Sequence, residues 1–173
     1  MKTQLFVLGC LVALALACGR AERATDAGDT VRMTVVTREE VRDALVPKPM
    51  TLEFLDGPGM IPSPMHVRYD ADHPGARAAA ELLSGEVPRR VRTSATSDLS
   101  PRWAGMVIRP ADPEFDDPEG YRLTVDEDGV VLEASNADGF RKGAERVMQL
   151  MELSPDERTA VRFPAFTVTE PGP

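Results

Sequence analysis

Alternation of apolar and polar positions predicts most of the strands of this chain. The clearest segment is a β-hairpin in which Tyr121, Leu123 and Val125 alternate with polar residues, Asp128-Gly129 forms the turn, and residues 130–134 return. Shorter patterns predict further strands at residues 31–35, 51–55, 65–69, 103–108 and 165–169. Segments rich in turn-forming or small polar residues, at 56–59, 91–101 and 110–119, are expected to be loops.

Two longer segments have the period of an amphipathic helix. Residues 138–153 place apolar side chains on one face, at Phe140, Ala144, Val147, Met148 and Met151. A second helix begins at Pro74, carries an alanine and leucine stripe, and ends at Ser84-Gly85. Thr37 and Glu40 form a capping box that opens a shorter helical segment. These elements predict an α+β fold, a mostly antiparallel sheet with two main helices packed on one face.

An apolar run precedes the first predicted strand. Lys2 is followed by thirteen residues, 5–17, without a charge, which is the layout of a secretory signal peptide. A membrane-spanning helix needs roughly 20 apolar residues, so this run is too short for a permanent span. We therefore expect residues 1–17 to be removed on export.

The residue after this run is a cysteine. Ala15-Leu16-Ala17-Cys18 resembles the lipobox of bacterial lipoproteins, although that motif prefers a larger aliphatic residue at the first position. We expect Cys18 to be lipidated and to hold the protein at the periplasmic or cell-surface side of a membrane. The alternative is an ordinary signal peptide, in which Cys18 has no special role. Residues 18–30 are small, polar and charged, which is typical of a flexible tether.

Length and charge limit the remaining possibilities. With 173 residues and 28% charged residues, the chain is expected to form one folded domain and is too short for a (β/α)₈ barrel of about 250 residues. Its formal net charge of −8 argues against a nucleic-acid partner. With Cys10 removed in the signal peptide, an internal disulfide is excluded.

Residue types that often carry catalysis do not occur in convincing patterns. His66 and His73 lack the spacing of a helical metal site, and the Asp126-Glu127 and Asp156-Glu157 pairs fall in predicted loops. We therefore expect no catalytic residue, no metal and no cofactor among them.

The charged clusters and the lone tryptophan do not form convincing binding sites either. The acidic segment with Asp112, Glu114, Asp116 and Asp117 lacks the glycine and spacing of an EF-hand calcium loop. The cluster of Arg89, Arg90 and Arg92 has no interleaved aromatic residue of the kind that binds nucleic acid. Trp103 is the single candidate aromatic platform for a glycan, and we expect it to lie in the core.

The hairpin and the helix after it carry a family resemblance. The segment runs from Glu119-Gly120-Tyr121 through the Asp128-Gly129 turn to Gly139-x-x-x-Gly143 and Gln149-Leu150. It resembles the N-terminal non-catalytic domain of glycoside hydrolase family 20, the β-N-acetylhexosaminidases, which has an EGYxLxV strand, a DG turn and a GxxxG helix. Further likenesses extend the resemblance over residues 45–171, at Val46-Pro47-Lys48-Pro49, residues 79–83 and residues 163–171.

The resemblance implies the fold of an accessory domain without the catalytic residues. Family members use an Asp-Glu pair on a barrel that follows this domain, and no position of this sequence matches that pair. Arg141-Lys142 and Glu145-Arg146 stand where the family usually has aromatic residues and Gln-Thr, so we expect the surface that would meet a barrel to be altered. Gly139 and Gly143 are expected to let the helix approach the sheet closely.

The sequence thus predicts four parts, namely a signal peptide at 1–17, a lipidated cysteine and tether at 18–30, a strand and helix extension at 31–44, and the accessory domain at 45–171. The expected function is that of an exported, lipid-anchored, stand-alone accessory domain linked to amino-sugar glycan metabolism, without hydrolase activity. Two alternatives remain open. The chain is the N-terminal piece of a split or truncated hexosaminidase whose barrel is a separate partner, or it is a surface module that binds a glycan or a protein.

Overall fold

A computed structural model describes residues 32–97, 105–112, 115 and 119–170. The chain divides into two compact units, residues 1–30 and 31–173, and all described residues belong to the second. Its strands are β1 (Arg32–Val35), β2 (Thr51–Ile61), β3 (Met65–Asp70), β4 (Val91–Thr96), β5 (Gly105–Pro110), β6 (Tyr121–Asp126), β7 (Gly129–Ala134) and β8 (Thr159–Glu170). Its helices are α1 (Arg38–Ala44), α2 (Pro74–Glu86) and α3 (Ala137–Glu152).

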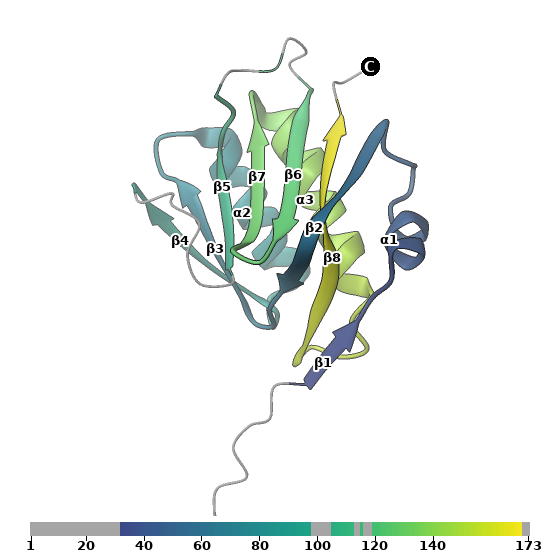
Figure 1. Cartoon of the computed structure of the whole chain (residues 1–173). Coiled ribbons are helices and arrows are strands. Elements are labelled where there is room, and N and C mark those ends of the chain that lie inside the picture. Colours follow the sequence, from purple (N-terminus) through teal and green to yellow (C-terminus); the bar gives the residue numbers. More distant parts are fainter. Residues whose placement is uncertain (1–31, 98–104, 113–114, 116–118, 171–173) are drawn as a thin grey trace, which may run out of the picture. The chain divides into compact units, whose positions relative to one another are not determined.

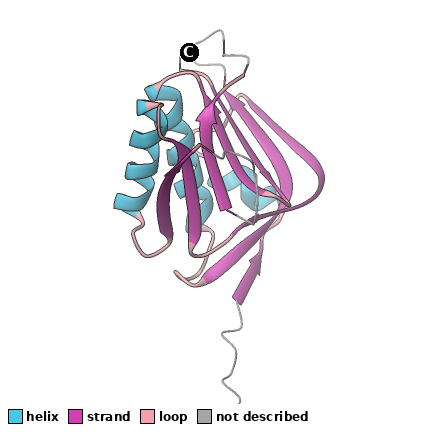
Figure 2. Ribbon diagram, turned by 90° about the vertical axis from the view of Figure 1, so that its left-hand side faces the viewer, coloured by secondary structure: helices cyan, strands magenta, loops and turns pink. Residues whose placement is uncertain are grey.

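The described strands form one sheet in the order β1-β8-β6-β7-β5-β3-β4, and β2 also pairs with β8 (Figure 1). The predicted hairpin is confirmed, since β6 and β7 pair from Tyr121 opposite Ala134 to Asp126 opposite Gly129. The two long helices, α2 and α3, lie together on one face of the sheet (Figure 2). The α+β class with two main helices on one face is therefore confirmed.

The sense of strand pairing differs from the expectation of a mostly antiparallel sheet. Among the described strands, four pairings are parallel and three are antiparallel. Helix α2 carries the chain from the end of β3 back to the start of β4, so the two neighbouring strands run in the same direction. Apolar alternation within a strand does not show whether the strand pairs parallel or antiparallel, because that depends on the path of the connection between the two strands.

Strand β4 was expected to be a loop, and that expectation was wrong. Only Val91 of this strand is buried, and residues 92–95 are exposed. A strand at the outer edge of a sheet needs few buried side chains, because its pairing with β3 supplies the backbone hydrogen bonds. The predicted strand at 103–108 begins at Gly105 in the described part of the chain and continues to Pro110.

Strands β2 and β8 are both longer than predicted. The two pair antiparallel from Thr51 opposite Thr169 to Ile61 opposite Val161, with a register shift between Phe54 and Pro58. Near its start β8 lies between β1 and the second half of β2. Near its end β8 lies between β6 and the first half of β2. Strand β2 therefore passes from one edge of β8 to the other (Figure 1). Gly57, with φ of +94°, lies in this crossing.

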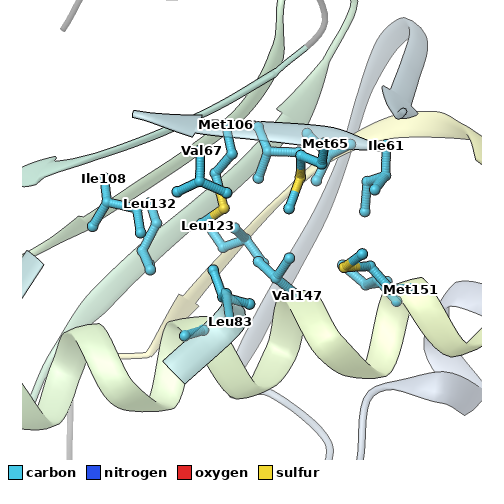
Figure 3. Close-up of a cluster of buried hydrophobic side chains, with 14 of the residues drawn as sticks. Ile61, Met65, Val67, Leu83, Met106, Ile108, Leu123, Leu132, Val147 and Met151 are labelled. Carbon is cyan, nitrogen blue, oxygen red and sulfur yellow. The ribbon is translucent and has the colours of Figure 1, made fainter. Parts of the chain in front are cut away.

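The core lies between the sheet and the two long helices. Figure 3 shows its centre, where side chains of β3, β5, β6 and β7 meet those of α2 and α3, among them Met65, Met106, Leu123, Leu132, Leu83 and Val147. Each of these side chains is fully buried. The strand and helix extension at 31–44 contributes as well, because Val36 and Val41 belong to the same buried cluster. Residues 31–173 thus contain one continuous core of their own.

Close contact between α3 and the sheet depends on two glycines. A Cβ atom on Gly139 would lie 2.5 Å from the carbonyl oxygen of Gly120, and one on Gly143 would lie 2.1 Å from a methyl group of Leu132. Both distances are far inside van der Waals contact. The expected close approach is confirmed. Gly129 also has the positive φ predicted for the hairpin turn, at +123°.

Candidate functional site

The two histidines have separate places in the fold. His66 is an exposed residue of β3. His73 caps α2, where its Nδ1 atom accepts a hydrogen bond from the Ala76 N–H at 3.4 Å, and its ring packs edge-on against Phe140. Among the described residues, no group of three His, Cys, Asp or Glu side chains is arranged to hold a metal ion.

Both acidic pairs lie at turns, since Asp126 ends β6 and Glu127 begins the hairpin turn, while Asp156-Glu157 lies between α3 and β8. The carboxylate of Asp126 accepts a hydrogen bond from the Asp128 N–H at 2.9 Å. Asp156 accepts hydrogen bonds from the Arg158 N–H and the Thr159 hydroxyl, and the first of these is the main reason why the pKa of Asp156 lies below its ordinary value. Glu157 forms an exposed ion pair with Arg89 at 3.4 Å. These carboxylates organise turns rather than converging on one point.

The predicted arginine cluster is dispersed by the fold. Arg89 pairs with Glu157, while Arg90 donates a hydrogen bond to the Met151 carbonyl at 2.7 Å. Burial lowers the pKa of Arg90 from its ordinary value. Arg92 is exposed on β4. The three side chains therefore do not form a common basic surface.

Several predicted residues lie outside the described part of the chain. They are Cys18, Trp103, Glu114, Asp116 and Asp117. Asp112 is described and is exposed after the end of β5. Within the described residues, no helix is long and apolar enough to cross a membrane.

The most organised polar group in the described structure lies where β8 ends. The Arg146 side chain of α3 donates one hydrogen bond from Nε to the Tyr121 hydroxyl at 3.0 Å and another from Nη2 to the Glu170 carboxylate at 2.7 Å. The Tyr121 hydroxyl donates in turn to the same Glu170 oxygen at 3.3 Å. Three elements, α3, β6 and β8, are thus joined by one closed triangle of hydrogen bonds, which we call the exit triad.

Burial makes these bonds stronger than surface contacts. Arg146 is only 6% exposed, and the Glu170 side chain is 23% exposed. Burial raises the pKa of Tyr121 to about 12, although the Arg146 guanidinium opposes this increase. Burial alone would lower the pKa of Arg146, but its hydrogen bonds to Tyr121 and Glu170 offset this, so the pKa lies above its ordinary value. Arg146 and Glu170 therefore form a charged pair with a neutral phenol between them.

The triad also reaches the loop before β2. Arg146 Nη1 donates to the Gln149 side chain at 3.2 Å, and the Gln149 amide donates to the Val46 carbonyl at 2.6 Å. Beside the triad, Lys142 forms an ion pair with Glu119, just before β6. The arrangement contains no nucleophile paired with a base. Its chemistry is that of a clamp, which fixes the end of β8 to α3 and to the loop before β2.

This geometry corrects the expectation for one helix residue. Arg146 was expected on an altered outer surface, but the structure buries it. The reason is its place on α3, since Gly143, Arg146 and Leu150 follow at helical spacing and are all buried. This helical spacing is visible in the sequence, and a charged residue on a buried helix face indicates a partner inside the protein. The neighbouring Arg141 is exposed, as expected, and pairs with Glu145 at 2.6 Å.

Comparison with known proteins identifies the fold family. Residues 43–170 match the model of glycosyl hydrolase family 20, domain 2. A search of curated proteins found no match.

Solved structures with similar folds are family 20 enzymes. The N-acetyl-β-hexosaminidase of Streptomyces plicatus, in complex with thio-NAglucal, is 23% identical and matches 74% of this chain and 26% of its own, with a TM-score of 0.57. The exo-β-N-acetylglucosaminidase of Vibrio harveyi is 20% identical over 75% of this chain and 19% of its own, with a TM-score of 0.55. The β-N-acetylhexosaminidase of Bacteroides fragilis is 19% identical over 73% of this chain and 24% of its own, with a TM-score of 0.53.

The matched region spans about a quarter or less of these enzymes, so the likeness to them concerns one domain. Within this chain the family match covers β2 to β8 and includes every residue of the exit triad. The sequence resemblance, the family match and the fold agree, and the chain belongs to glycosyl hydrolase family 20 through its domain 2.

Proposed function

We propose that this protein is an exported, lipid-anchored accessory domain of the β-N-acetylhexosaminidase type, which acts in amino-sugar glycan metabolism without hydrolase activity of its own. The carrying observation is the extent of the family match. The family match covers β2 to β8 of this chain, whereas the region of similar structure makes up only 26% of the Streptomyces plicatus enzyme. A domain of this kind supplies a folded scaffold, and the glycosidic chemistry belongs to a barrel.

The site geometry supports a role without catalysis. Glycosidases of most families place two carboxyl groups on either side of the scissile bond. In the exit triad the one carboxylate, Glu170, is engaged by Arg146 and Tyr121. The acidic pairs at 126–127 and 156–157 lie at the ends of strands or in turns, where Asp126 and Asp156 accept hydrogen bonds from nearby backbone N–H groups.

An activity assay tests this proposal directly. Purified protein incubated with a chromogenic N-acetylglucosaminide is expected to show no turnover above the buffer rate. The matched control is the Glu170→Gln variant, which should give the same result. Hydrolysis by the wild-type protein that a substitution within this chain abolishes would refute the proposal.

The anchor is tested separately. We propose that Cys18 carries the lipid, with residues 19–30 as the tether. Mass spectrometry of protein from the membrane fraction should find an acylated N-terminal peptide that begins at Cys18, and Cys18→Ser should release the protein from the membrane fraction. An unmodified Cys18 in the mature peptide would exclude the lipid anchor while leaving the accessory-domain proposal intact.

A second candidate is a split enzyme, in which this chain completes a barrel encoded elsewhere. It is favoured by the 26% and 19% coverage of the two enzymes, because these relatives carry the domain within a much longer chain. A neighbouring reading frame that encodes a family 20 barrel without its own domain 2 would support this candidate. An intact hexosaminidase gene in that position would count against it.

A further inference from the structure

The dipeptide Asp-Gly occurs three times in the chain, at residues 56–57, 128–129 and 138–139. In this dipeptide the amide nitrogen of the glycine attacks the side-chain carboxyl carbon of the aspartate and closes a five-membered imide, because glycine has no Cβ atom to hinder the approach. The attack requires a glycine N–H that is released from its hydrogen bonds and a backbone that rotates at the aspartate. The three dipeptides therefore share one chemistry, and the fold decides which of them reacts.

The dipeptide at 138–139 is held by a helix cap. Asp138 and Gly139 lie in the first turn of α3, where the Gly139 N–H donates a hydrogen bond to the Asn136 side chain at 3.1 Å. Gly139 is also buried, and a Cβ atom built on it would lie 2.5 Å from the Gly120 carbonyl oxygen. The cap thus engages the glycine nitrogen, and the helix fixes the backbone of Asp138.

The dipeptide at 128–129 is held by the hairpin. Gly129 pairs with Asp126 across the two-residue turn between β6 and β7, and in such a turn the N–H of the last residue donates to the carbonyl of the first. Gly129 is buried as well, and a Cβ atom on it would lie 2.3 Å from the Gly105 carbonyl oxygen of β5. The glycine nitrogen is therefore engaged, and the backbone around it has little room to rotate.

The dipeptide at 56–57 has neither of these restraints. It lies in the register shift of β2, and residues 55–57 have no partner in the described strand pairings. Asp56 and Gly57 are both exposed, whereas the glycines of the other two dipeptides are buried. A Cβ atom on Gly57 would have nothing within 4 Å, so the space around this backbone is open. An exposed segment without a strand partner opens locally at little cost in free energy.

We propose that Asp56 is a site of spontaneous isoaspartate formation. The Gly57 nitrogen forms a bond to the side-chain carboxyl carbon of Asp56, the carboxyl hydroxyl leaves with the proton of the nitrogen as water, and the imide remains. Water then adds to one of the two imide carbonyls and breaks its bond to the nitrogen. Addition at the side-chain carbonyl restores aspartate, and addition at the backbone carbonyl gives isoaspartate. The reaction needs only water, and it depends neither on the proposed function nor on the lipid anchor.

The position of Asp56 gives this modification a structural consequence. Residues 51–54 and 58–61 pair with two separate stretches of β8, and the dipeptide lies in the link between them (Figure 1). Isoaspartate carries the backbone through the side chain and lengthens this link by one methylene group, so we expect part of the pairing of residues 58–61 to be lost. An aged sample should therefore have a lower thermal unfolding midpoint than a fresh one, and an unchanged midpoint would contradict this consequence.

Isotope labelling tests the choice of site. The purified, folded protein is incubated in water enriched in heavy oxygen, so that each cycle of imide formation and hydrolysis places a heavy oxygen atom in the reacting residue. Peptide mass spectrometry locates the label, and an isoaspartyl methyltransferase with its methyl donor counts the isoaspartate. We expect label to enter at Asp56 at least about ten-fold faster than at Asp128 or Asp138, because the last two must first release the N–H of the following glycine.

Three comparisons separate the effect of the fold from that of the dipeptide. In urea, where all three dipeptides are unpaired, the three rates should agree to within about three-fold. Asp56→Asn should form the imide faster in the folded protein, because a neutral amide is more electrophilic than a carboxylate and ammonia leaves in place of water. The matched variant Asp138→Asn has the same chemistry beside an engaged nitrogen and should stay slow. Asp56→Glu, which would have to close a six-membered ring, should take up no label there. Circular dichroism verifies that each variant is folded.

Two results would overturn the proposal. One is a folded protein in which the three aspartates take up label at equal rates. The other is a folded protein in which Asp56 stays unlabelled over the time in which the chain in urea is labelled. Label that is confined to Asp56 in the folded protein, is absent in Asp56→Glu and appears at all three sites in urea supports it.

Discussion

At the scale of single residues, Arg146 has the largest expected effect on stability. Arg146→Met removes the cation from the exit triad and leaves the Glu170 carboxylate and the Tyr121 hydroxyl without their strongest partner. Breaking a buried ion pair on one side costs about 3–5 kcal/mol, and partial exposure of Glu170 reduces this to about 2–3 kcal/mol. Urea unfolding followed by circular dichroism measures the loss.

Arg141→Met is the matched control for that variant. Arg141 is on the same helix, but its side chain is 52% exposed and its partners, Asp138 and Glu145, lie at the surface. Exposed pairs contribute about 0–1 kcal/mol, so the free energy of unfolding should change little. If Arg146→Met and Arg141→Met lose the same free energy of unfolding, the triad adds no stability beyond that of an ordinary surface ion pair.

Tyr121 gives a pH dependence at the alkaline end. Its pKa is raised from 10.0 to about 12 in the folded protein, because burial disfavours the phenolate. A raised folded-state pKa contributes stability that is complete below pH 10 and is lost as the pH rises to about 12. Absorbance titration of a Tyr69→Phe variant should therefore show one tyrosine titrating near pH 12.

The unfolding data provide the corresponding check. The free energy of unfolding of the wild-type protein should decrease between pH 10 and about 12. The decrease should be smaller in Tyr121→Phe, which has no proton to lose at this position. If the phenol of Tyr121 titrates near the ordinary pKa of tyrosine in the folded protein, the buried environment of the triad is contradicted.

At the scale of elements, the packing of α3 on the sheet depends on its glycines. In Gly139→Ala the new methyl group would meet the Gly120 carbonyl oxygen at 2.5 Å, and backbone cannot move as a side chain can. Overpacking of this kind costs about 1–3 kcal/mol, partly offset by the better helix propensity of alanine. We expect a net loss of about 1–2 kcal/mol in urea unfolding.

Gly85→Ala is the matched control in the other long helix. A Cβ atom there would have nothing within 4 Å. Alanine should stabilise this position by about 0.5 kcal/mol, because it restricts the unfolded chain. A stabilising effect at Gly139 as well would mean that α3 can shift away from the sheet at little cost.

At the scale of the whole molecule, the extension of β1 and α1 belongs to the folded unit although the family match begins at residue 43. A chain that starts at residue 43 loses Val36 and Val41, which are 5% and 0% exposed, and uncovers one edge of β8. Each buried valine contributes about 1.5–3 kcal/mol, so this chain should be less stable by about 3 kcal/mol or more than one that starts at residue 31.

The comparison needs a second truncation as its control. A chain that starts at residue 31 keeps all described core residues, so its thermal unfolding midpoint should equal that of a chain that starts at residue 19. If the chain that starts at residue 43 is equally stable, the extension is an appendage rather than part of the core.

Local pattern alone determined several features of this protein. The hairpin of β6 and β7 and the helix α3 are fixed by alternation, by a turn glycine and by helical spacing, all of which act between near neighbours in sequence. The capping box of Thr37 and Glu40 is likewise present as predicted. The family resemblance rested on the same segment, which is why it could be found without a structure.

Only the tertiary structure decided the rest, because contacts between distant residues have no local signature. Strand β4 exists because β3 pairs with it, and four of the described pairings are parallel because of the path of the connections. Strand β2 pairs with one edge of β8 near its start and with the other edge near its end. Arg146 has the composition of a surface residue, and its burial follows from Tyr121 and Glu170, which lie 25 and 24 positions away in sequence. A buried charge is stable only when such partners meet it, and only the folded chain brings them together.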